Sequence, residues 1–390
     1  MKHVNTGVRG FWSVKFFAFL LSFLTFTWTF ASDPGHDAHE NHGTTEVENH
    51  VDSTAVHGEN AHGEEGHGEE AFTAASMAGT ILHHISDAHE WHFFTVGGTH
   101  VTLPLPVILY SEQYGLDIFM SSQFHHNHGV YKHYKNDHEH ILLLDEEGNV
   151  LEGASVMDFS VTKNVASMLI AFILMAWIFI SMANAYKKRP GQAPKGLQSF
   201  MEPLVLFVRD EIARPNLGHN YARFMPYLLT LFFFIWINNM LGLLPGAANV
   251  TGNIAVTMVL SLIALVVTNI NGNKSYWGHI FWPPGIPTPV KFILIPVEVI
   301  SIFTKPFALM IRLFANITAG HIIIMSILCL IFLFSDNGNN ASAGFGVSFA
   351  SVPFAIFLYT LELLVAAIQA FIFTMLTALF IGQAMPEDHH

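Results

Sequence analysis

Cysteine and charge are both scarce in this chain. The single cysteine, Cys329, lies in an apolar run, which excludes a disulfide framework and a site built from several cysteine ligands. Charged residues make up 12% of the 390 residues, whereas hydrophobic residues make up 51% and include 35 phenylalanines. A soluble globular domain carries about 25% charged residues. We therefore expect most of the chain to be membrane protein.

Basic residues are nearly absent from residues 33–160. This segment holds 22 of the 30 acidic residues and 18 of the 24 histidines, but its only lysines are Lys132 and Lys135. The rest of the chain is net basic, so the overall net charge of −13 averages two regions of opposite chemistry. We expect these two regions to meet near residue 160.

Residues 1–31 have the pattern of a secretory signal peptide. Basic residues precede an apolar run at 16–24, and the small residue Ala31 offers a cleavage point. An uncleaved anchor helix is the alternative. Either reading delivers the following residues to the outer side of the membrane.

Residues 32–89 are rich in glycine, glutamate and histidine, and we expect them to be disordered because they offer little apolar surface to bury. Histidines and carboxylates at this density could hold zinc or copper weakly. No ligand spacing repeats, so we favour a solvated acidic tail over a metal site. The histidines that keep the metal alternative open are His62, His67, His125, His126 and His128.

Residues 90–160 predict a small β-rich region outside the cytoplasm. Short strand-like runs occur at 101–109, 140–144 and 150–152, and 145–149 has the composition of a hairpin turn. No catalytic constellation is recognisable there.

Residues 161–390 form the expected membrane domain, an all-α region with about five spanning helices. A segment at 196–214 mixes apolar and charged residues and suits an interfacial amphipathic helix. The last two apolar runs are about twice the length that crosses a bilayer upright, so we expect a hairpin of strongly tilted or bent helices. The predicted spans are 165–186, 224–244, 254–270, 292–334 and 347–384.

Basic residues orient these spans. They occur in the links at 187–223 and 271–291, which we place inside, and are absent from the links at 245–253 and 335–346, which we place outside. The N-terminus is then outside and the C-terminus inside, in agreement with the signal pattern.

Few ionisable residues lie in the two long C-terminal runs. Glu298, Lys305 and Arg312 are seven residues apart and Asn316 follows after four, so all four fall close to one helical stripe that would face a partner or water. His321 points the other way, towards the last helix. There Glu362 and Gln369 are also seven residues apart.

An arginine at a bilayer centre costs from about 3 to more than 10 kcal/mol, so Arg312 is expected to be functional. For its polar neighbours, purely structural roles are the alternatives. Lys305 and Glu298 could be snorkelling or paired near an interface. Asn316 and Gln369 could be interhelical hydrogen-bond partners, and the remaining histidine and glutamate could form a structural pair.

Several separated motifs resemble subunit a of F-type ATP synthases. Lys305-Pro306 together with IRLFAN at 311–316 is similar to its K-P…R-L-F-x-N signature, and QAFIF at 369–373 is similar to its last-helix motif. NNMLGLLP at 238–245 and the residues at 253–257 fit its second and third spans. The resemblance covers residues 160–390 and leaves out the histidine-rich N-terminal region.

The resemblance implies a non-catalytic stator subunit without a cofactor, in the bacterial inner membrane, with a periplasmic N-terminal region and a cytoplasmic C-terminus. Its partners would be the c-ring, the peripheral-stalk subunit b, other ATP synthase subunits and membrane lipid, with no nucleic acid. By this analogy Arg312 faces a carboxylate on the c-ring. Protons enter from outside through His321 and Glu362 and leave inside past Glu298.

Two alternatives stay open at this stage. The same subunit could translocate sodium, because the ring subunit largely decides the coupling ion. A metal-cation transporter with a histidine-rich collector would need several histidines or carboxylates within the spans, and His321 is the one histidine there. The pairing of histidine with glutamate favours protons.

Overall fold

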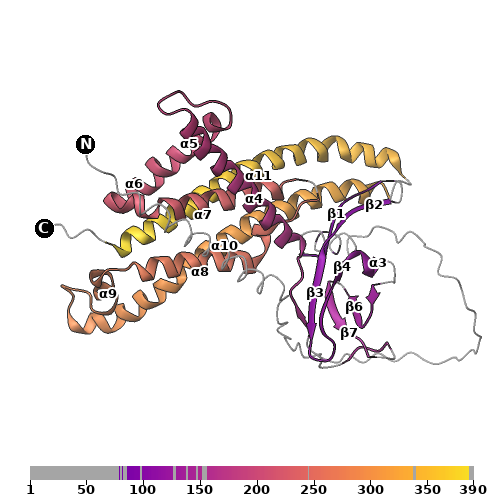
Figure 1. The fold of residues 1–390 in the computed structure, drawn as a ribbon, viewed down its shortest axis with the longest axis horizontal. Coiled ribbons are helices and arrows are strands. Elements are labelled where there is room, and N and C mark those ends of the chain that lie inside the picture. The colour runs from indigo at the N-terminus through magenta and orange to yellow at the C-terminus, as the bar shows by residue number, and fades with distance from the viewer. Residues whose placement is uncertain are drawn as a thin grey trace, which may run out of the picture.

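The computed structural model in Figure 1 has a helical domain and a smaller β-rich part, which we call the membrane domain (161–385) and the cap (86–160). The structure describes residues 79, 81, 86–96, 99–125, 129–137, 139–145, 148–151, 156–244, 246–336 and 340–385. The predicted signal peptide and nearly all of the predicted disordered segment lie outside these residues and stay predictions.

The described residues of the cap form three small antiparallel sheets and one short helix, α3 (Ser122–His125). Each sheet joins strands that are close in the sequence, except that β8 returns from the end of the cap to pair with β3. The sheets are β1 (Glu90–Val96) with β2 (Thr99–Pro104); β4 (Gly115–Met120), β3 (Pro106–Ser111) and β8 (Val156–Asp158); and β5 (Val130–Tyr131), β6 (Tyr134–Asp137) and β7 (His140–Leu143).

The predicted strand at 101–109 is wrong in one respect, because it is two strands in two different sheets. β2 ends at Pro104 and β3 begins at Pro106, with Leu105 between them. Proline cannot donate a ladder hydrogen bond, so two prolines around one residue end one strand and start another. The strand expected at 140–144 is present as β7, whereas the one expected at 150–152 is reduced to a single bridge between Val150 and Leu144.

The membrane domain consists of helices that share one apolar core. The first four elements after the cap are α4 (Lys163–Lys188), α5 (Leu197–Phe207), a π-helical segment (Val208–Ala213) and α6 (Arg214–Leu217). The remaining helices are α7 (Tyr221–Gly242), α8 (Ile254–Ile270), α9 (Lys274–Phe281), α10 (Thr288–Phe334) and α11 (Ala341–Ala384).

Within the described residues, four helices are long and apolar enough to cross a membrane, and the pair α8 and α9, bent by 104°, would make five. The separate helix expected at 196–214 is present as α5, the π-helical segment and α6, and Gly218, whose φ of 52° and ψ of −128° are not helical, separates it from α7. Its interfacial position stays a prediction. A π-helical segment carries the chain through its charged part, where Asp210 pairs with Arg209 and Arg214. α10 has 47 residues, about 70 Å, more than twice the hydrocarbon thickness.

The cap and α9 lie at opposite ends of the helical domain (Figure 1). At the cap end, the Trp91 indole Nε1 donates a hydrogen bond to the Gly246 carbonyl at 2.8 Å, which ties the cap to the link between α7 and α8. At the other end, the Asn273 amide donates to the carbonyl of Ala384 at 2.8 Å, which ties the turn before α9 to the end of α11. The chain therefore runs between these two ends five times, in α4, α7, α8, α10 and α11.

The start of α4 is fixed by the cap. The Asp87 carboxylate accepts hydrogen bonds from the Thr162 hydroxyl at 2.8 Å and from the Asn164 amide at 3.1 Å. Asn164 belongs to the first turn of the helix, whose amides otherwise lack partners, and Thr162 is the N-cap residue. Asp87 thus contacts α4 although it lies three residues before the boundary expected from the sequence.

A buried histidine holds the end of the cap together. The His89 imidazole lies between two carboxylates, with Nδ1 at 3.0 Å from Glu139 Oε2 and Nε2 at 2.6 Å from Asp158 Oδ2. Burial alone would lower the pKa of His89, but the hydrogen bonds and charges of Asp158 and Glu139 outweigh it and raise the pKa to about 10. His89 is therefore an imidazolium at neutral pH.

Because the pKa of His89 is raised in the folded cap, the stabilisation is complete below an unfolded value near 6.5 and is lost as the pH rises through about 10. We expect hydrogen exchange of the cap amides, corrected for intrinsic rates, to lose protection over that range. The His89→Ala variant should lose about 3 kcal/mol of cap stability and most of this pH dependence. His140→Ala, at an exposed histidine of the same cap, is the control. An unchanged pH profile in His89→Ala would contradict this role.

Candidate functional site

The candidate site lies between the two longest helices, α10 and α11, which run antiparallel. Their polar side chains meet in three pairs along the interface. From the α9 end towards the cap end, these are Lys305 Nζ with Gln383 Oε1 at 3.4 Å, Asn316 Nδ2 with Gln369 Oε1 at 3.0 Å, and His321 Nε2 with Glu362 Oε1 at 3.6 Å.

Arg312 lies between the first and second pairs and differs from all of them. Its side chain is exposed on the surface of α10. Among the residues that the structure describes, it makes no hydrogen bond or ion pair. A permanently charged guanidinium in an apolar helix needs a partner, so the partner of Arg312 is expected on another molecule.

Glu362 is the most buried ionisable side chain of the site. Its side chain is 4% exposed, against 15% for His321. No described group donates a hydrogen bond to either carboxylate oxygen, and Oε1 lies 3.6 Å from His321 Nε2.

Gly320 makes room for this carboxylate. A Cβ atom at Gly320 would lie 2.8 Å from Glu362 Oε1 and 3.1 Å from its Cδ, closer than ordinary contact. The absence of a side chain therefore lets Glu362 approach α10 beside His321. A sequence offers no signal for such a contact, because it depends on how the two helices meet.

The single stripe expected for Glu298, Lys305, Arg312 and Asn316 needs correction. Lys305 and Asn316 both reach α11, and the Lys305 ammonium lies 5.4 Å from the Phe380 ring centroid. A spacing of seven drifts by about 20° per step on a straight helix, and long side chains at the edge of a stripe can turn towards the neighbouring helix. Asn316 and Gln369 are therefore interhelical hydrogen-bond partners, as the structural alternative predicted.

Asn239 on α7 is a residue of the site that the sequence analysis did not select. Its amide Nδ2 donates to the carbonyl of Ala366 at 3.2 Å, and its Oδ1 accepts from the Thr251 hydroxyl at 2.7 Å. Both side chains are buried. Ala366 lies one turn from Glu362, so α7 holds α11 beside the carboxylate. The sequence signal that could have identified Asn239 is the presence of an asparagine inside an apolar span.

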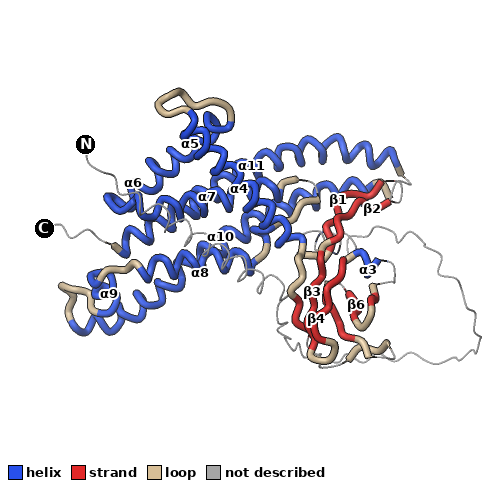
Figure 2. The backbone as a smooth tube through the Cα atoms, in the orientation of Figure 1, coloured by secondary structure: helices blue, strands red, loops and turns tan. Residues whose placement is uncertain are grey.

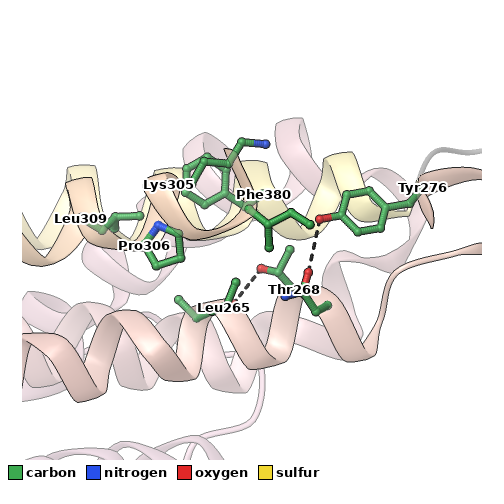
Figure 3. Close-up of a pocket in the computed structure, with 10 residues that line it drawn as sticks. Leu265, Thr268, Tyr276, Lys305, Pro306, Leu309 and Phe380 are labelled. Atoms are coloured by element: carbon green, nitrogen blue, oxygen red, sulfur yellow. Dashed lines mark hydrogen bonds between the residues drawn. The ribbon is translucent and has the colours of Figure 1, made fainter. Parts of the chain in front are cut away.

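A small cavity of about 20 Å³ lies beside Lys305, at the end of the domain away from the cap. α8, α9, α10 and α11 all contribute to its lining. Figure 3 shows Tyr276 at one end of this cavity and Leu309 at the other, with Thr268 along one side. The Tyr276 hydroxyl donates to Asn269 Oδ1 at 3.3 Å. The half-buried Glu298 lies within electrostatic range of Tyr276.

Metal ligation finds no support in the part of the chain that the structure describes. No group of three or more histidine, cysteine, aspartate or glutamate side chains there is arranged to hold an ion. His62, His67, His126, His128 and the side chain of His125 lie outside the described part.

The chain is similar to known proteins in both of its parts. Residues 165–382 match the family described as ATP synthase A chain, and residues 80–159 match a domain of unknown function (DUF8433). The ATP synthase subunit a of Chloroherpeton thalassium is 46% identical over 237 residues, which cover 60% of this chain and 69% of the relative. That of Myxococcus xanthus is 44% identical over 257 residues, 63% of this chain and 80% of the relative.

The family match spans more than half of the chain and contains all five helices that run between the two ends of the membrane domain, apart from two residues at the start of α4 and two at the end of α11. It also contains every residue of the candidate site except Gln383. The chain therefore belongs to the ATP synthase A chain family, as a multi-pass membrane subunit, subunit a, of the Fo sector of F-type ATP synthase.

Proposed function

We propose that this subunit conducts protons through two half-channels that open to opposite sides of the membrane and meet at a rotating c-ring. The observation that carries the proposal is the position of Arg312. It is an exposed cation on α10 without a partner among the described residues, between a titratable pair towards the cap and a cavity at the opposite end.

Arginine suits the point where the half-channels meet because it keeps its proton at all accessible pH values. It cannot relay a proton, so it blocks a direct leak. Its charge stabilises the ionised form of a nearby carboxylate. A protonated carboxylate on a ring subunit would therefore release its proton as it approaches Arg312, and would take up a new one after passing it.

His321 and Glu362 supply the outer half-channel in this proposal. They lie towards the cap end, 3.6 Å apart, and both side-chain types exchange protons in membrane proteins. The hydrogen bond between Asn316 and Gln369 holds the two helices together on the path from this pair to Arg312. Asn239 fixes α11 from the opposite side.

The cavity beside Lys305 supports an inner half-channel. A cavity of about 20 Å³ is large enough for about one water molecule, and the hydroxyl of Thr268 and the Tyr276–Asn269 pair offer it polar partners. Glu298 lies on the same helix, two turns before Lys305, towards the inner end. Together they give a proton a polar route away from Arg312.

The proposed orientation follows from the fold and the charges. The acidic cap would lie in the periplasm, and the end that carries α9 and the C-terminus of α11 would lie in the cytoplasm, where the basic links belong. The membrane would be the bacterial inner membrane, reached with a signal peptide at 1–31. The boundaries at residues 89 and 160, and the c-ring and peripheral-stalk subunit b as partners, belong to the same proposal.

Protons fit this site better than sodium. Sodium, like other hard cations, prefers oxygen ligands, whereas the pair at the outer site includes an imidazole. ATP-driven proton uptake into vesicles should therefore persist in sodium-free buffer. A strict requirement for sodium would favour the sodium-translocating alternative.

Arg312→Ala should abolish ATP-driven proton pumping in membrane vesicles, since no fixed charge would then separate the two half-channels. Fluorescence quenching of a pH-sensitive dye measures pumping, and immunoblotting of membranes checks that the subunit is still inserted. Arg223→Ala, at an exposed arginine of α7 that bonds to Asn271, is the matched control and should pump normally. Normal pumping by Arg312→Ala would overturn the proposal.

Glu362→Gln should reduce the rate of passive proton flux through Fo at least tenfold, because the amide keeps the shape but cannot carry a proton. Glu362→Asp should restore part of the flux. Thr360→Ala, at an exposed residue two positions away, is the control. Equal flux in Glu362→Gln and the wild type would mean that the pair with His321 is structural.

Gly320→Ala should also slow passive flux, since the new methyl group would displace the Glu362 carboxylate. Overpacking of this kind costs about 1–3 kcal/mol, so we expect a several-fold decrease. Gly346→Ala on α11 is the matched control, because a Cβ there meets no atom within 4 Å. If both alanine variants conduct like the wild type, the close approach has no role in the proton path.

A further inference from the structure

One face of the cap's main sheet is apolar and exposed, although a soluble sheet normally turns polar side chains to water. Along β3 and β4 the side chains alternate, and Val107, Leu109 and Phe119 point into the core of the cap. The alternate positions carry no charge. They are Tyr110 (43% exposed), Leu116 (61%), Ile118 (64%), Met120 (42%), Met157 (55%) and Phe159 (39%), which we call the apolar face.

Strand register places these residues side by side. Tyr110 pairs with Leu116 on one side and with Met157 on the other. Partners across antiparallel strands share a face. The apolar face is therefore one continuous patch across β4, β3 and β8, and patches of this kind mark protein or membrane contacts.

The segment that contains Met157 and Phe159 shows in which direction the apolar face points. Pairing with β3 continues past β8, since the Phe159 amide donates to the Ile108 carbonyl at 2.8 Å and the Val161 amide to the Pro106 carbonyl at 3.0 Å. Val161 thus points to the same face of the sheet as Phe159, and it packs against the core of the membrane domain. The apolar face is continuous with a surface that contacts the helices.

Figure 2 agrees with this orientation. The sheet of β5, β6 and β7 covers the opposite face of β3 and β4, and it lies on their far side from the helices. The apolar face is the other one, so it turns towards the side where the membrane domain lies. Where the cap extends beyond the helices, the apolar face would meet the lipid that surrounds the membrane domain.

The chain leads from this face directly into the membrane. α4 begins at Lys163, four residues after Phe159, and from its second turn it exposes an apolar stripe that includes Leu169, Ile170 and Ile173. Such a stripe in a spanning helix is lipid-facing. Leu169 lies six residues, about 9 Å along the helix axis, from Lys163, and at most about 14 Å of extended chain separates Lys163 from Phe159.

We propose that the apolar face of the cap lies in the outer interface of the lipid bilayer, and so anchors the cap beside the helices. Its composition fits that environment, since apolar side chains are joined by Tyr110, and tyrosine is enriched at membrane interfaces. The cap is acidic, so burial of apolar area must drive the contact instead of attraction to anionic lipid. The contact should then be insensitive to salt.

The test uses the full chain with Cys329→Ala, which removes its only cysteine. Ile118→Cys carries an environment-sensitive fluorophore, and the protein is reconstituted in phosphatidylcholine and phosphatidylglycerol vesicles, alone and within the assembled ATP synthase. We expect quenching by lipids spin-labelled near the headgroup and protection from iodide, at low and high salt. Val150→Cys, an exposed cap residue outside the apolar face, is the control and should show the reverse.

Each other outcome at position 118 overturns the proposal. Quenching by iodide would mean that the face is open to water. Protection from both quenchers would mean that protein covers it, and protection found only in the assembled enzyme would assign it to another subunit. A second label at Met157→Cys should give the same pattern as position 118, because the two positions belong to one patch.

Discussion

The low dielectric of the bilayer is the constraint on which this structure depends, because each polar group inside it needs a partner. The long helices α10 and α11 meet that demand with one another. Lys305, Asn316 and His321 each reach a polar side chain on α11. Arg312, on the same helix, makes no hydrogen bond or ion pair with the described residues, and the proposed conducting role rests on its exposure.

The rigidity of α11 is as important as its chemistry. Asn239 and Thr251 form a buried polar pair that reaches the backbone of α11 at Ala366. Because the hydrogen bond goes to a backbone carbonyl, it fixes the helix and leaves the side chains of Glu362 and Gln369 free for other contacts. In the proposed function, a stator that works against a rotating ring would need its titratable groups held at constant distances, and this network would supply that.

Much of the membrane domain could be predicted from the sequence, because apolar length and helix caps are local signals. The predicted span at 254–270 has the observed bounds of α8, where the Asn253 side chain accepts a hydrogen bond from the Ala255 amide and caps the helix. The site residues were selected because ionisable groups are rare in apolar runs.

The features that could not be predicted from the sequence depend on distances between elements that are far apart in the chain. The contact of Gly320 with Glu362 and the bond from Asn239 to Ala366 arise only when helices far apart in the chain meet. The helical wheel could not show that the exposed Asn316 bonds to Gln369, since it assigns directions without a neighbouring helix. In the cap, apolar alternation could not show whether Leu105 continued one strand or separated two.

The short segment from Asp87 to Trp91 contacts the start of α4 and the link between α7 and α8. Asp87 holds the start of α4, and Trp91 holds the link that joins the end of α7 to α8. This segment precedes all three helices in the chain, so in the proposed orientation it would be exported before they are inserted. Docking of the cap would then not be complete until α7 had crossed the membrane and delivered Gly246 to the outer side. In that orientation, the cap would make the arrangement of the first spans a late step of assembly that depends on the direction in which α7 has been inserted.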